Sequence, residues 1–191
     1  MNIISRRVRA ALVSTAVAGA GLSGVLGSGV AHASTGRADG FIVYTSCTAV
    51  SGTIRINPGL HAVKARTVQE VLSSTTSGCS NIFSGSIAGS GTFTATMSGT
   101  ATYKAQNLTG TFTINWPAAS GYNPSNGTLS ETESNGVETV SGTVTSGFET
   151  GAKFALQYSI TGHTGKPKST TGVTAETLVN TQALTLSVNT G

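Results

Sequence analysis

The chain has 191 residues, and only 9% of them are charged, which excludes a charge-driven disordered protein. Its 25 glycines follow no three-residue period and are accompanied by only 4 prolines, so a collagen-like fibre is excluded as well. Three arginines in the first 33 residues supply most of the net charge of +4. The remaining 8 basic and 7 acidic residues are too balanced to indicate binding to nucleic acid or to an anionic membrane.

The first 33 residues have the three parts of a secretory signal peptide. A cationic segment, 1–9, precedes a small and mostly apolar segment, 10–30, and Ala31-His32-Ala33 supplies small residues for the cleavage site. The apolar segment is rich in Gly, Ser and Ala, and no other stretch approaches the roughly 18 apolar residues of a transmembrane helix. We therefore expect cleavage before Ser34 and a secreted, extracellular protein with no membrane contact afterwards. Sec and twin-arginine export both remain open.

Residues 34–191 form one predicted domain with two cysteines, Cys47 and Cys79. An even number of cysteines in an exported protein favours a structural disulfide bond between them. The bond would close a loop of about 33 residues, and in the chain-entropy model such a loop stabilises the fold by roughly 3–4 kcal/mol. Two thiols without a nearby histidine make a poor zinc site, so we expect no metal and no cofactor.

Strict alternation of apolar and polar residues is the main structural signal along the domain. It predicts strands at 40–50, 92–104, 112–116, 154–160 and 184–188, each with one apolar face. Asn135-Gly136 predicts a hairpin in which Ser134 faces Val137, Glu133 faces Glu138 and Leu129 faces Gly142.

Two segments are harder to interpret. Asn57-Pro58-Gly59 predicts a turn. Segment 60–72 fits either a helix or a strand, and we choose a strand because its surroundings are all-β. Together the patterns predict nine or ten strands in an antiparallel β-sandwich, Ig-like or jelly-roll-like, with an antiparallel β-barrel as the alternative.

Few residues could carry out catalysis. Asp39 is the only aspartate, and the domain has two histidines, His61 and His163, so we expect no enzymatic activity. The acidic cluster Glu131, Glu133 and Glu138 could form a glycosidase-type or metal-binding set. We favour a solvated hairpin tip instead, because carboxylates are seldom buried without partners.

Aromatic residues indicate a polysaccharide-binding site. Trp116 and Tyr122 bracket a short loop, and Asn123 and Asn126 add amides that could hydrogen-bond a sugar. We favour the competing interpretation, in which Trp116 fills the core, since it shares a strand face with Phe112 and Ile114. A basic stretch at 162–168 is a candidate contact loop for an acidic partner.

Exposed strand edges suggest a third mode of binding. An open sandwich with few charges leaves edges on which a partner strand could pair, and residues 34–40 could be donated in the same way. We therefore expect a secreted, non-catalytic protein-interaction protein: a subunit, an adaptor, or a surface or inhibitor-type binder. Polysaccharide binding through the Trp116–Tyr122 loop is the alternative.

One resemblance agrees with this. A signal peptide, Cys47, the turn Pro58-Gly59-Leu60, Cys79 and the Thr/Gly-rich strands that follow resemble small secreted β-sandwich proteins of actinobacteria that have no assigned activity. The resemblance implies export and an all-β fold, and it carries no binding residues to this chain.

Overall fold

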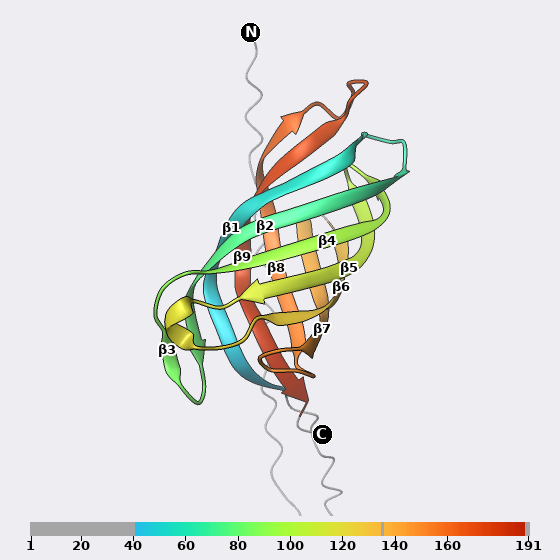
Figure 1. Cartoon of the computed structure of the whole chain (residues 1–191). Coiled ribbons are helices and arrows are strands. Elements are labelled where there is room, and N and C mark those ends of the chain that lie inside the picture. Colours follow the sequence, from blue (N-terminus) through green and yellow to red (C-terminus); the bar gives the residue numbers. More distant parts are fainter. Residues whose placement is uncertain (1–40, 135, 190–191) are drawn as a thin grey trace, which may run out of the picture. The chain divides into compact units, whose positions relative to one another are not determined.

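The computed structural model describes residues 41–134 and 136–189, and the predicted signal peptide and residues 34–40 lie outside the described residues. The described chain forms nine strands in a single antiparallel sheet (Figure 1). The strands are β1 (Phe41–Leu60), β2 (Arg66–Asn81), β3 (Gly85–Ile87), β4 (Gly91–Thr102), β5 (Ala105–Asn115), β6 (Ser125–Ser134), β7 (Val137–Ser146), β8 (Lys153–Gly165) and β9 (Val173–Asn189). One short 3-10 helix, η1 (Ala118–Ser120), lies between β5 and β6. Among these residues there is no helix with the length and apolar character needed to cross a bilayer.

The sheet closes on itself because β1 pairs with β2 on one side and with β9 on the other. Strand β3 pairs only with the last residues of β2. The other eight strands each pair with the strands before and after them, which makes an up-and-down barrel. An eight-stranded barrel has an interior just wide enough for side chains to fill.

The predicted sandwich is therefore wrong in its finer detail, and the alternative, an antiparallel barrel, fits the structure. Alternation fixes which residues face inward, but a sandwich and a barrel share that alternation. The difference is the ladder between β1 and β9, which pairs Phe41 with Asn189. Because the barrel is closed, its eight strands have no unpaired edges, and the hypothesis that a partner strand adds to such an edge loses its basis there.

The predicted strand faces and the predicted hairpin register are confirmed. In β4, Phe93, Ala95 and Met97 are buried, and the threonines between them are exposed. Between β6 and β7, Ser134 pairs with Val137, Glu133 with Glu138, and Leu129 with Gly142.

The predicted turn at Asn57-Pro58-Gly59 is wrong, because these residues lie inside β1. The register between β1 and β9 shifts between Arg55 and Leu60, so the segment is part of an irregular stretch of strand. Proline is tolerated at such an irregularity, since it cannot donate to a regular ladder. The chain turns at 61–65 instead, so 60–72 is neither one helix nor one strand but the end of β1, a turn and the start of β2.

Aromatic rings fill one half of the barrel interior. Phe154 stacks on Phe93 and on Phe112, with ring centroids 5.1 and 4.7 Å apart. All three residues lie near the ends of their strands that meet the β5–β6 and β7–β8 connections. Burying rings of this size is a dominant stabilising contribution in a core.

The predicted disulfide bond joins Cys47 of β1 to Cys79 of β2. The two residues face each other directly in the β1–β2 ladder, and both are buried. The bond therefore links β1, which closes the barrel by pairing with β9, to β2 on its other side.

Replacing both cysteines with serine should lower the free energy of unfolding by about 2–4 kcal/mol, because the unfolded chain regains the entropy that the closed loop removes. Urea unfolding followed by circular dichroism measures the change. A double variant as stable as the parent would show that the bond contributes nothing to the native barrel.

Candidate functional site

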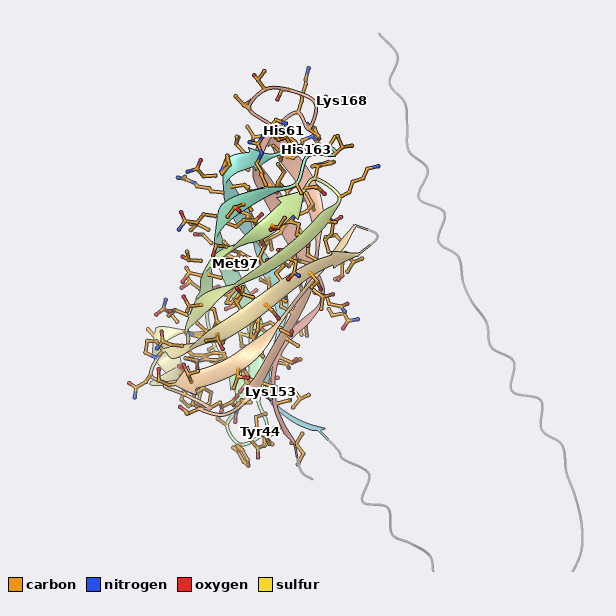
Figure 2. All side chains as sticks on the ribbon, turned by 90° about the vertical axis from the view of Figure 1, so that its right-hand side faces the viewer. Tyr44, His61, Met97, Lys153, His163 and Lys168 are labelled. Carbon is orange, nitrogen blue, oxygen red and sulfur yellow. A yellow bond between two sulfur atoms is a disulfide. The ribbon has the colours of Figure 1, made fainter. Side chains whose placement is uncertain are left out.

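The two ends of the barrel differ in chemistry. We call the end formed by 82–84, 116–124 and 147–152, with the start of β1 and the end of β9, the aromatic end. We call the end formed by the turns at 61–65, 103–104 and 166–172 the basic end. Figure 2 shows Tyr44 and Lys153 toward the first end, and His61, His163 and Lys168 toward the second. Alternate connections of an up-and-down barrel meet at the same end, which is why segments distant in sequence converge there.

Four glutamates lie inside the barrel in the half next to the basic end. Glu70 and Glu131 are 0% exposed, Glu138 is 3% exposed and Glu176 is 4% exposed. The solvated hairpin tip expected for the acidic cluster is therefore wrong for Glu131 and Glu138, and Glu133 is half-buried. The reason is strand parity, because Glu131 shares the inner face with Leu129, and Glu138 shares it with Val140.

Few donors satisfy these carboxyl groups. The Tyr158 hydroxyl donates to Glu131 Oε1 at 2.5 Å, and Gln106 Nε2 donates to Glu138 Oε1 at 3.4 Å. Neither oxygen of Glu70 has a hydrogen-bond partner, and neither do the Oε2 atoms of Glu131 and Glu138. Unpartnered polar groups of this kind are costly inside a protein.

Burial shifts the acid–base properties of the whole group. Burial, and after it the nearby carboxyls of Glu131 and Glu176, raise the pKa of Glu70 to about 9. Burial, then Glu131, raises the pKa of Glu138 to about 9. Burial raises the pKa of Glu131 to about 7 in spite of the hydrogen bond from Tyr158, and it raises the pKa of Glu176 to about 7. At neutral pH the interior therefore retains protons that exposed glutamates would release.

This acidic interior is almost closed to solvent. Its four glutamates are at most 4% exposed. No group of three or more His, Cys, Asp or Glu side chains in the described part of the chain is arranged to hold a metal ion. The group acts on stability, through the cost of ionising it.

The protein should be most stable in mild acid and lose stability as pH rises from about 5 toward 9. The folded pKa values of these glutamates lie above the unfolded value, so the folded state binds more protons in this window and unfolding releases them. Thermal unfolding followed by circular dichroism at pH 5, 7 and 9 measures the trend. A melting temperature that rises or stays constant over this range would contradict it.

Glu70→Gln should stabilise the protein at pH 8, on the order of 2 kcal/mol or more, and should flatten the pH dependence. The amide keeps the shape of the side chain and is neutral at every pH, so folding no longer has to hold a proton that the unfolded chain releases at pH 8. Glu133→Gln is the matched control, because Glu133 is only half-buried and its replacement should change the slope less.

The basic residues of three separate turns converge on the outside of the same half. These turns carry four exposed lysines: Lys64, Lys104, Lys166 and Lys168. The predicted contact stretch 162–168 consists of the last residues of β8 and the start of the loop that leads to β9. His163 contacts the edge of Tyr103, with ring centroids 5.8 Å apart. Exposed cations therefore lie at the same end of the barrel as the buried acids.

The structure does not assemble the residues of the predicted sugar site. Trp116 is only 6% exposed, and its Nε1 donates to Ser125 Oγ at 2.9 Å, so its ring belongs to the core. Asn123 is exposed in the loop, whereas Asn126 lies on the outer face of β6, where its Oδ1 accepts a hydrogen bond from Thr113. Of these four residues, Tyr122 lines the pocket described below, and the other three are not among its described lining residues.

That pocket opens at the aromatic end and has a volume of about 390 Å³. Its rings come from four segments: Tyr44 from β1, Phe83 from the loop after β2, Tyr122 from the loop before β6, and Phe148 from the β7–β8 connection. Tyr122 stacks on Phe148 at 3.8 Å between centroids, and Tyr44 contacts Phe83 at 5.5 Å. The Tyr122 hydroxyl donates to Ser84 Oγ at 2.7 Å, which ties two of these segments together.

Glu149 lies at the same pocket in an unusual conformation. Its φ of 57° is the only positive φ of a non-glycine residue among those described, and this conformation costs roughly 1–2 kcal/mol. Its Oε1 accepts hydrogen bonds from Thr45 Oγ1 at 2.5 Å and from Asn81 Nδ2 at 2.8 Å. Its Oε2 is buried without a hydrogen-bond partner. Burial raises the pKa of Glu149, and the two hydrogen bonds oppose that rise.

Comparison with known proteins does not assign the chain to a family. No protein-family model, no curated protein and no solved structure matches it. The site must therefore be judged on its own geometry. Sequence analysis missed Tyr44, Phe83, Phe148 and Glu149, which lie in three different segments, and no local motif could have brought these segments together.

Proposed function

We propose that the protein is a secreted, non-catalytic binding protein that docks a partner protein at its aromatic end. The observation that carries this proposal is the open pocket of about 390 Å³ walled by four aromatic rings. Pockets of this size and lining accommodate a small ligand or one side chain of a partner. Aromatic rings around such a pocket are also the commonest anchors in protein interfaces.

Exposed apolar residues extend the surface around the pocket. Ile82 is 57% exposed and Phe83 is 79% exposed in the loop after β2, and Ile42 is 44% exposed at the start of β1. Phe83 both walls the pocket and projects from it. Large side chains exposed together at one end are typical of an interaction site.

The remaining chemistry supports binding rather than catalysis. Burial raises the pKa values of the interior glutamates, but these side chains lie within the barrel and are at most 4% exposed. Among the described residues that line it, the pocket at the aromatic end has one carboxyl group, Glu149, and no histidine, cysteine or serine. It lacks the pair of acid and base groups that hydrolytic mechanisms use.

Polysaccharide binding is the second candidate, and it moves to new residues. A sugar ring would stack on Tyr44, Phe83 or Tyr122 rather than on the buried Trp116. Asn81 also lines the pocket, but its amide is already hydrogen-bonded to Thr45, to Glu149 and to the backbone of the loop after β2. Retention on insoluble polysaccharide that is lost in Phe83→Ala would favour this candidate over a protein partner.

Phe83→Asp should abolish co-elution of the protein with its partner in culture supernatant, because a charge replaces an apolar contact at the proposed interface. Native size exclusion followed by mass spectrometry of the co-eluting proteins measures the effect. Val63→Asp is the matched control, since Val63 is 91% exposed at the basic end. A native mass equal to that of one chain for the parent protein, or equal loss of co-elution in both variants, would contradict the proposal.

A further inference from the structure

The four rings at the aromatic end form a wall with a particular electrostatic character. The face of an aromatic ring carries partial negative charge, and cations lie favourably against it. Tyr44, Phe83, Tyr122 and Phe148 all line the pocket, and they come from four separate segments. Such an arrangement suits a cationic group better than an anionic one.

A carboxyl group adds to this character. Glu149 lines the pocket, and hydrogen bonds from Thr45 and Asn81 fix one of its oxygens while the other has no hydrogen-bond partner. No Lys, Arg or His is among the residues lining the pocket. Lys153, at the nearby start of β8, donates instead to Thr143 Oγ1 at 3.1 Å. Among the described residues, the pocket therefore has an acidic group without a cation beside it.

We propose that the pocket at the aromatic end binds an organic cation, an alkylated ammonium or a guanidinium group, between its rings and next to Glu149. The inference rests on the proposed function for the place of binding and adds the chemistry of the group that is bound. Aromatic rings recognise quaternary ammonium and methylated amine groups, and a neighbouring acidic group adds electrostatic attraction.

The cation can reach the pocket from two sources. A free small molecule such as a quaternary amine fits the volume of about 390 Å³. A lysine or arginine side chain of the partner protein presents the same chemistry, and its apolar stem would lie along Phe83 and Ile82 at the exposed rim. The experiment below tests the shared chemistry and then separates the sources.

The first arm compares choline with 3,3-dimethylbutan-1-ol, in which carbon replaces the charged nitrogen. The probe is the fluorescence of Trp116, the single tryptophan, whose ring contacts Phe148 edge-on at 5.5 Å between centroids. Isothermal titration calorimetry on the full mature chain gives an independent affinity. We expect saturable binding of choline and at least about tenfold weaker binding of the neutral alcohol.

The second arm uses variants that preserve the fold. Glu149→Gln keeps a carbonyl oxygen that can accept from Thr45 and Asn81, and it should weaken choline binding about tenfold. Phe83→Ala should weaken it as well, and it should not affect folding because Phe83 projects into solvent. Val63→Ala and Glu133→Gln, at and near the basic end, are the matched controls and should bind choline as the parent does.

The third arm replaces choline with N-acetyl-lysine amide and N-acetyl-arginine amide. In both compounds the acetyl group is on the α-nitrogen, so the side-chain cation is kept. If they bind more tightly than choline, the source of the cation is a side chain of the partner. If choline binds more tightly, the source is a free quaternary amine. Equal affinity for choline and the neutral alcohol, or an unchanged affinity in Glu149→Gln, would overturn the inference. So would the absence of binding by every cation. If Phe83→Asp still abolished partner co-elution in that case, the proposed function would stand without the cation.

Discussion

The hydrogen-bond ladder between β1 and β9 is the constraint on which the rest of the structure depends. Strand β1 is 20 residues long and pairs along most of its length with both β2 and β9. Without the second ladder, two long strands rich in threonine and serine would expose their edges. With it, the sheet encloses a single interior, and every second residue of eight strands must fit there. Because neighbouring strands run in opposite directions, the connections between them alternate between the two ends of the barrel.

The interior is divided into two halves with opposite chemistry. Stacked phenylalanines fill the half next to the aromatic end, where burial stabilises the fold. Glutamates occupy the other half, where burial without partners costs stability. The lysines, by contrast, lie outside and exposed. The acidic side chains therefore lie mostly inside the barrel and the lysines lie outside. The outer surface is for this reason more basic than the nearly equal numbers of acidic and basic residues indicate.

Sequence patterns predicted the local structure well and the long-range structure poorly. The register at Asn135-Gly136 and the disulfide bond between Cys47 and Cys79 are confirmed, because a turn type and a pair of thiols are local or compositional signals. Closure depends on strands at opposite ends of the sequence, which no periodicity encodes. The buried glutamates could have been recognised. Glu70 lies between Val68 and Leu72 on the inner face of its strand, and the same parity applies to Glu131. The expectation that carboxylates avoid burial outweighed this signal.

The candidate site shows the same division between local and long-range information. Tyr122 stood out because it lies near Trp116 in sequence, yet Trp116 faces the core and Tyr122 faces a pocket built from other segments. A hydrophobic residue in an irregular loop, such as Phe83, carries no periodic signal. The positive φ of Glu149 is likewise a property of the folded backbone, and a glycine would be the usual residue there.

The pairing of Phe41 with Asn189 brings the first and last described residues of the barrel together at one pole. The order of strands around the barrel is therefore cyclic, and the position of the chain break is arbitrary with respect to the hydrogen-bond pattern. A circular permutant that starts at β9 and ends at β8, with a short linker from 189 to 41, would form the same ladders. Its new ends would lie in the loop 166–172, among the lysines, and the old seam beside the aromatic pocket would become a continuous connection.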